Sequence, residues 1–147
     1  MKSRQLLTIG YEGKSVDEFI EQLRKNKVTR LIDIREAPIS HKKGLSKSAL
    51  RELLNANDIE YIHLKTLGCP STIRKQFKLD HDQDRLFKEY AKYLADNPKA
   101  LAELDKYLSD GINCIMCFEA DPNRCHRKVI VEKIKEYDGK GLKIEHI

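Results

Sequence analysis

The sequence has no run of apolar residues close to the roughly 20 that a membrane-spanning helix needs. Its N-terminal stretch starts with basic residues but has only a few apolar ones before Gly10, too few for the core of a signal peptide. Cysteine is scarce, with four in the chain. Without an export signal we expect these thiols to be buried, catalytic or metal-bound, as in other proteins of a reducing compartment. These absences together favour a cytoplasmic protein with no membrane contact.

The chain is long enough for one globular domain, which we expect to span residues 1–147. Hydrophobic residues make up 40% of it and charged residues 35%, a balance typical of a folded chain rather than a disordered one. The net charge is +5, and the excess lies in the first half of the chain, densest from His41 to Arg51. A one-sided basic surface attracts nucleic acid or phosphate-bearing ligands, although an ordinary solvated lysine surface has the same composition.

Short apolar runs alternate with amphipathic segments along the chain. The apolar runs predict strands at 6–9, 28–34, 59–64, 112–118 and 142–147. The amphipathic segments predict helices at 16–26, 46–57, 85–95, 99–108 and 125–137. The first of these helices starts with a capping-box pattern, in which Ser15 precedes Glu18. Residues 71–84 are polar with little periodicity, so we expect a lid or a long loop there.

This alternation favours a single α/β domain. We expect an open, mostly parallel sheet of about five strands flanked by helices, in a Rossmann-like three-layer arrangement. In such sheets the ligand site lies beyond the carboxyl ends of the strands. The segments that follow predicted strands in this way are GYEG, DIREAPIS, HLKTLGCP and CFEADPNRCHR. Most of the unusual polar residues of the sequence lie in them, so we expect a functional site there.

The segment CFEADPNRCHR carries the strongest candidates for catalysis. Cys125, His126 and Arg127 would open a helix, where free backbone N–H groups and the helix dipole favour anions and thiolates. Cys125 is therefore the best candidate for a nucleophile, although a small buried cysteine would give the same sequence. Glu119, in the preceding turn, is a candidate general acid or base, and His126 would orient or protonate a leaving group.

The pattern Cys114-x-x-Cys117, followed by Cys125 and His126, raises the question of a zinc site. Cys114 and Cys117 lie within a predicted strand, where residues three apart point to opposite faces. A zinc knuckle needs both sulfurs on one side of a turn, so we expect no metal and no cofactor. Cys117 instead joins Cys125 as a candidate catalytic thiol, either as a nucleophile or as half of a redox pair.

The first two strand ends offer further candidates. Tyr11 and Glu12 lie in a glycine-flanked turn, where Glu12 would act as a general base or be an ordinary exposed carboxylate. Asp33 and Arg35 alternate at the end of the second strand and are expected to pair. Such a pair is structural or holds a ligand phosphate or carboxylate.

Residues after the third strand carry less information. A lone histidine such as His63 is more often a core residue than a functional one. Cys69 stands five residues before Arg74, loosely like an anion-binding loop, but Pro70 fits such a loop poorly.

Taken in order, TIGYEG, LIDIREAPIS, GLSKSAL, IEYIHLKTLGCP and CFEADPNRCHR are similar to the family called domain of unknown function 488. The resemblance spans nearly the whole chain, and its most specific part is the closing Cys…Glu…Cys-His-Arg pattern. The positions that match the family pattern are Gly10, Tyr11, Asp33, Arg35, Pro38, Ser40, Gly68, Pro70, Cys117, Glu119, Cys125, His126 and Arg127. The chain departs at His41, where the family often has arginine, and at Leu45, where an aromatic residue is common. If that arginine contacts a ligand, Lys42 or Lys43 must replace it, or the ligand differs.

These observations support three hypotheses for function. The first is an enzyme, such as a hydrolase or transferase, that binds and processes a phosphate-bearing partner, either a nucleotide or nucleic acid. The second is a nucleic-acid-binding module with no chemistry, and the third is a thiol-based redox or sulfur-transfer protein. The candidate catalytic residues are Cys125, His126, Glu119, Cys117 and Glu12. The candidate ligand-binding residues are Gly10, Tyr11, Asp33, Arg35, Ser40, His41 and Arg127.

Overall fold

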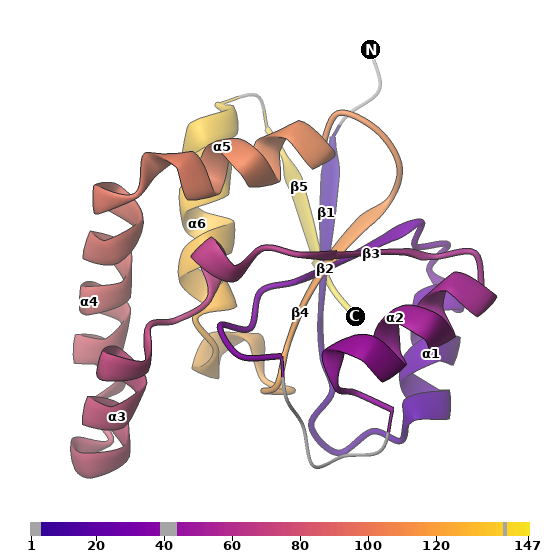
Figure 1. The fold of residues 1–147 in the computed structure, drawn as a ribbon. Coiled ribbons are helices and arrows are strands. Elements are labelled where there is room, and N and C mark those ends of the chain that lie inside the picture. Colours follow the sequence, from indigo (N-terminus) through magenta and orange to yellow (C-terminus); the bar gives the residue numbers. More distant parts are fainter. Residues whose placement is uncertain (1–3, 39–43, 140) are drawn as a thin grey trace.

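The computed structural model describes residues 4–38, 44–139 and 141–147 (Figure 1). Its strands are β1 (Gln5–Gly10), β2 (Arg30–Asp33), β3 (Glu60–His63), β4 (Asn113–Cys117) and β5 (Lys143–His146). Its helices are α1 (Val16–Lys25), α2 (Lys47–Ala56), α3 (Ser71–Asp80), α4 (Gln83–Asp96), α5 (Pro98–Tyr107) and α6 (Arg127–Asp138). Two short 3-10 helices are η1 (Lys65–Leu67) and η2 (Pro122–Arg124). Among the described helices, none is both long and apolar enough to cross a membrane.

The strands form one parallel sheet in the order β3-β2-β4-β1-β5. Helices α1 and α2 cover one face, and α4, α5 and α6 cover the other (Figure 1). The connections through α1 and α2 run in one direction across the sheet, and those through α5 and α6 run back. Because crossovers between parallel strands are right-handed, opposite directions place the helices on opposite faces. The predicted open α/β sheet with three layers is confirmed.

Alternation along β4 divides its side chains between two apolar cores. Cys114 and Met116 pack with the α1–α2 layer, whereas Ile115 and Cys117 pack with the layer of α4, α5 and α6. All four side chains are buried. The predicted opposite orientation of Cys114 and Cys117 is confirmed, so the two sulfurs do not face one another.

The start of α1 follows the sequence pattern that predicts it. The hydroxyl of Ser15 accepts a hydrogen bond from the backbone N–H of Glu18 at 3.1 Å, which satisfies a donor that the first turn leaves free. Phe19, Ile20 and Leu23 form the buried face of the helix. The helix therefore packs on the sheet through the residues whose spacing predicts it.

The segment 71–84, which we expected to be a lid or a long loop, is not a long loop. Helix α3 spans Ser71–Asp80, and α4 already starts at Gln83. None of the α3 side chains is buried, and the helix packs on α4 rather than on the sheet (Figure 1). Its Ile73 is only partly buried against the core. A helix with no fully buried side chain needs little apolar periodicity, so the sequence pattern does not reveal it. A role of α3 as a lid stays a prediction.

Gly10, the last residue of β1, lies directly against the turn that follows β4. A Cβ at this position would overlap the carbonyl group of Glu119. We therefore expect Gly10→Ala to displace that turn and to lower the free energy of unfolding by about 1–3 kcal/mol, the usual cost of overpacking. The measurement is urea denaturation beside Gly13→Ala, whose added Cβ meets no atom within 4 Å, so that its cost is limited to the strain of a side chain at φ +76°. A smaller loss in Gly10→Ala than in Gly13→Ala would contradict the close approach.

Candidate functional site

The segments that follow β4 and its two neighbouring strands leave the carboxyl ends of these strands toward opposite faces of the sheet. In the sheet β4 lies between β1 and β2. The chain leaves β1 and β2 toward the α1–α2 layer, whereas it leaves β4 toward α6 in the opposite layer. Open α/β sheets bind ligands in the crevice that such a divergence creates. The site predicted from the sequence pattern is expected at this place.

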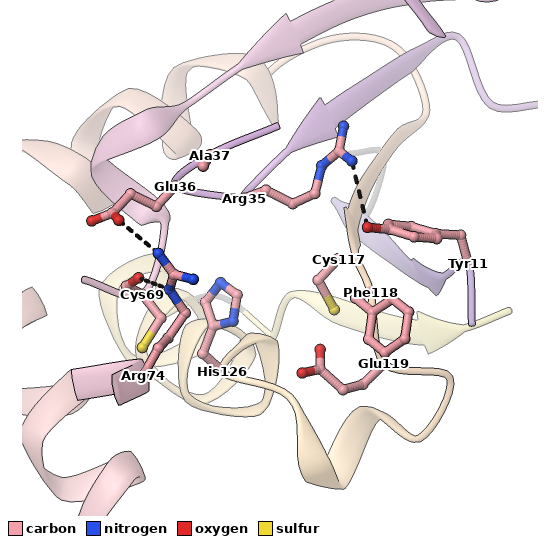
Figure 2. A pocket seen from close by; sticks show the side chains of 10 residues that line it. All are labelled: Tyr11, Arg35, Glu36, Ala37, Cys69, Arg74, Cys117, Phe118, Glu119 and His126. Carbon is pink, nitrogen blue, oxygen red and sulfur yellow. Dashed lines mark hydrogen bonds and ion pairs between the residues drawn. The ribbon is translucent and has the colours of Figure 1, made fainter. Parts of the chain in front are cut away.

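A cavity of about 240 Å³ lies in this crevice (Figure 2). Its lining residues are Tyr11, Arg35, Glu36, Ala37, Cys69, Arg74, Cys117, Phe118, Glu119 and His126. A second cavity of about 260 Å³ adjoins it between α3, α4 and the segment after β4, and the two share Cys69, Arg74, Glu119 and His126. Three of the candidate catalytic residues, Cys117, Glu119 and His126, therefore line one cavity.

Cys117 and Cys125 bring their sulfurs into contact as a disulfide across the turn that follows β4. Cys117 is the last residue of β4 and lines the cavity, whereas Cys125 follows η2 and lies behind it, next to the start of α6. Both side chains are about 1% exposed. The sequence pattern predicts Cys125 as the best candidate for a nucleophile, but Cys117 is the member of the pair that lines the cavity.

One backbone N–H group at the start of α6 points at the sulfur of Cys125. The backbone N–H of Arg127 donates to its sulfur at 3.4 Å, at the N-terminal end of α6. Free N–H groups and the dipole at a helix N-terminus stabilise a negative sulfur. The Nδ1 atom of His126 lies 3.7 Å from the same sulfur. Helix α6 starts at Arg127, two residues later than predicted, because η2 occupies the preceding turn.

His126 is neutral at physiological pH and has a fixed orientation. Its Nε2 lies 3.1 Å from the carbonyl oxygen of Ile34. A carbonyl only accepts, so Nε2 carries the proton and Nδ1 offers a lone pair toward Cys125. Burial lowers the pKa of His126 to about 4, and the charges of Arg127 and Arg74 act in the same direction. His126 is therefore an acceptor beside the thiol rather than a proton donor.

Glu119 and Glu12 lie on either side of the turn after β4 but differ in role. Burial raises the pKa of Glu119, the charge of Glu12 adds to the rise, and the charge of Arg127 opposes it. Glu12 is exposed, and its carboxylate accepts the backbone N–H of Ala120 at 3.0 Å. Glu119 thus belongs to the cavity as a candidate acid or base, whereas Glu12 supports the turn that presents it.

Asp33 and Arg35 form the expected pair, and it is buried. The guanidinium donates to both carboxylate oxygens of Asp33, at 2.9 and 2.7 Å, and to the carbonyl of Leu45 at 2.8 Å. The hydroxyl of Tyr61 donates to the same carboxylate at 2.5 Å. Burial alone would lower the pKa of Arg35, but its hydrogen bonds and charge pairing with Asp33 outweigh burial and raise it. Most donors of Arg35 are thereby committed within the protein, although the side chain borders the cavity.

Arg127 is placed behind the cavity rather than in it. Its side chain is 1% exposed, and Nη2 donates to the carbonyl of Ala120 at 2.9 Å. Among the described residues, its Nε and Nη1 groups have no hydrogen-bond partner. Burial lowers the pKa of Arg127, while interactions with Cys114, Glu119 and Asp121 oppose that effect. The guanidinium is therefore a buried positive charge beside the turn of the dithiol.

The remaining candidates have varied positions. Tyr11 packs its ring edge-on against Phe118, with 5.3 Å between the ring centroids. His63 contacts the backbone carbonyl of Arg35 through Nε2 at 2.6 Å, which agrees with a structural role. The candidate ligand-binding residues Ser40 and His41 lie outside the described residues.

Glu36 and Arg74 line the cavity but are absent from the candidate site residues. The guanidinium of Arg74 donates to Glu36 at 2.8 Å and to the carbonyl of Cys69 at 3.0 Å (Figure 2). Cys69 thus meets Arg74 through its backbone and does not form an anion-binding loop with it. The one sequence signal for Glu36 is its place just beyond β2, because its partner Arg74 lies 38 residues further along the chain.

Comparison with known proteins gives one match. The model of the family described as domain of unknown function DUF488 matches residues 15–134. The chain belongs to this family. No curated protein and no solved structure matches the chain.

The DUF488 match contains most of the cavity. Asp33, Arg35 and the whole segment from Cys117 to Arg127 lie inside the matched range. Gly10, Tyr11 and Glu12 precede it. The family description specifies no reaction, so the geometry of the cavity is the basis for the chemistry proposed below.

Proposed function

We propose that Cys117 and Cys125 carry out thiol–disulfide exchange with a small thiol or disulfide that binds in the cavity. The observation that carries this proposal is the contact between the two sulfurs at the wall of a cavity, with one of them facing it. The sequence predicts a cytoplasmic protein, and in that compartment disulfides are usually catalytic or redox-sensing. The proposal develops the thiol-based hypothesis of the sequence analysis.

The exchange needs no reactant beyond the small thiol. A substrate thiolate attacks the sulfur of Cys117, the bond between Cys117 and Cys125 breaks, and Cys125 leaves as a thiolate. A second substrate thiolate attacks the substrate sulfur of this mixed disulfide and releases Cys117. Two electrons and two protons pass from two substrate thiols to the protein dithiol, and a substrate disulfide forms. The reverse sequence reduces a substrate disulfide.

The positions of the two cysteines suit these separate roles. Cys117 lines the cavity, whereas Cys125 receives the N–H of Arg127 at the start of α6. A thiol with a stabilised thiolate is the faster leaving group, which favours cleavage toward Cys125. The carboxylate of Glu119, whose pKa is raised by burial, lies within 4.8 Å of the Cys117 sulfur, a distance over which one bridging water can pass the thiol proton.

The phosphate-processing hypothesis has less support from this geometry. Of the cations assigned to it, Arg35 is paired with Asp33, and Arg127 does not line the cavity and donates to the carbonyl of Ala120. Arg74 borders the cavity but already contacts Glu36. The hypothesis of a nucleic-acid-binding module stays a prediction, because part of its basic stretch lies outside the described residues.

The test is to trap the mixed disulfide. Cys125→Ser is reduced, mixed with an oxidised low-molecular-weight thiol, and examined by mass spectrometry of its peptides. We expect an adduct on Cys117 at least ~10-fold faster than on Cys69. The carboxylate of Glu119 lies within 4.8 Å of the Cys117 sulfur, where it can take up the thiol proton, whereas burial raises the pKa of Cys69 to about 12 and leaves little thiolate. Wild-type protein should instead form the internal disulfide and release the small thiol.

Two comparisons make the result specific. In Cys114→Ser the exchange should be unchanged, because Cys114 is buried in the core on the other face of the sheet. In Cys117→Ser the fast adduct should disappear. The proposal fails if all four thiols of the folded wild-type protein react at similar slow rates, or only after unfolding.

A further inference from the structure

The turn after β4 gathers a third donor beside the two sulfurs. Ligand atoms of Cys117, Glu119 and Cys125 all lie within 4.8 Å of one another. The sulfur of Cys117 points toward the carboxylate of Glu119 in Figure 2. Both cysteines are buried and Glu119 is half-buried, so the group is shielded from bulk water. Two thiolates with one carboxylate make a donor set that suits zinc, whereas magnesium and calcium prefer oxygen alone.

We propose that the reduced protein binds one zinc ion through Cys117, Cys125 and Glu119. Binding would release the two thiol protons and form two zinc–sulfur bonds and one zinc–oxygen bond. Cys114, the residue that the sequence pattern pairs with Cys117, takes no part because it faces the opposite core. The site therefore differs from the zinc knuckle that the sequence analysis rejected.

The spacing of the two cysteines fits a shared metal ion. Their Cα atoms are 7.4 Å apart, wider than the 4.4–6.8 Å usual for a disulfide. Two thiolates on one tetrahedral zinc lie roughly 3.8 Å apart, as follows from zinc–sulfur bonds of about 2.3 Å. Reduction lets the sulfurs separate to that distance by small side-chain rotations, with the carboxylate of Glu119 at hand.

The charge around the group also fits. Two thiolates and a carboxylate exceed the charge of one Zn²⁺ by one negative unit. The guanidinium of Arg127 lies beside this turn, 1% exposed, and two of its N–H groups have no partner among the residues that the structure describes. Its charge acts on Glu119 across the turn. A buried positive charge at this place compensates the excess negative charge of the loaded site.

The fourth coordination position would face the cavity, because Cys117 and Glu119 both line it. Three protein ligands with one open position are typical of zinc sites that bind a further ligand. The zinc-bound form and the disulfide exclude one another, since both use the same two sulfurs. Zinc binding itself requires only the reduced thiolates and does not depend on the proposed exchange reaction.

The experiment measures zinc binding to the full chain, kept reduced by a phosphine under exclusion of oxygen. Competition with a chromophoric chelator gives the stoichiometry and the affinity. We expect one zinc per wild-type chain and none in the oxidised protein. Cys117→Ser, Cys125→Ser and Glu119→Gln should each weaken binding by more than the roughly 10–100-fold that loss of an outer-shell partner costs. Cys114→Ser is the matched control that should keep wild-type affinity, because Cys114 packs in the opposite core.

A cobalt titration of the wild-type protein makes the test independent of how the variants fold. We expect thiolate-to-cobalt charge-transfer absorption that saturates at one equivalent and disappears when zinc is added. Absence of this absorption, or equal loss of zinc in Cys114→Ser, overturns the zinc site. If zinc does not bind but Cys117 still forms its mixed disulfide, this inference alone fails. If zinc binds and no exchange occurs, the proposed function alone fails.

Discussion

Asp33→Ala should lower the free energy of unfolding by about 3–5 kcal/mol, the cost of leaving a buried charge without its partner. Asp33 is fully buried, and its carboxylate receives the guanidinium of Arg35 and the hydroxyl of Tyr61. The substitution leaves both donors buried without their hydrogen-bond acceptor. The total free energy of unfolding of a small domain is about 5–15 kcal/mol, so a loss of this size should lower the urea midpoint strongly.

The matched control is Glu60→Ala, at the other end of the same two strands. Glu60 pairs with Arg30 across β2 and β3 at 2.9 Å, but its side chain is 52% exposed. Exposed pairs contribute about 0–1 kcal/mol, so this variant should remain close to wild type. Equal losses of unfolding free energy in Asp33→Ala and Glu60→Ala would show that the buried pair stabilises the protein no more than the exposed pair does.

A double substitution separates a structural pair from a ligand site. Asp33→Leu with Arg35→Met removes both charges, and we expect it to be more stable than Asp33→Ala alone, because apolar replacements of buried ion pairs are often neutral. Cys117 in the folded double variant should still form its mixed disulfide. Loss of that adduct in a folded protein would instead give Arg35 a direct role in substrate binding.

The fold was predictable wherever side chains take part in the core. The capping box of α1 and its buried residues Phe19, Ile20 and Leu23 are visible in the spacing of the sequence. The apolar runs likewise predict every strand of the sheet, although β2 is shorter than the run that predicts it. Helix α3 was not predictable in this way, because it has no fully buried side chain and is held by α4 and by hydrogen bonds to Glu36.

The candidate site was predictable in place but not in detail. The rule that ligands bind beyond the strand ends selects the segment with Cys117, Glu119 and Cys125, and the structure places all three together. The sequence does not tell which sulfur faces the cavity, because that depends on the course of η2 between them. It also does not reveal that Tyr61 donates to Asp33, since the two residues lie 28 positions apart and meet only through the register of β2 and β3.

His126 should make the protein lose stability as the pH falls from about 6.5 to 4. Burial lowers its pKa from 6.5 to about 4 in the folded protein. In this range the unfolded chain binds more protons than the folded one, so the free energy of unfolding decreases toward acid. This difference in pKa lowers the free energy of unfolding by about 3 kcal/mol once His126 is protonated in both the folded and the unfolded chain. By pH 4.5 the loss is about 2 kcal/mol. The contribution is fully present at pH 7 and above.

The measurement compares urea midpoints of wild type and His126→Gln at pH 7 and pH 4.5. Carboxylates also titrate between these values, but they are common to both proteins and cancel in the difference. The stability advantage of wild type over His126→Gln should shrink by about 2 kcal/mol at the lower pH. A constant advantage would mean that His126 titrates normally in the folded protein, and its Nδ1 would then carry a proton, not a lone pair, beside Cys125 at mildly acidic pH.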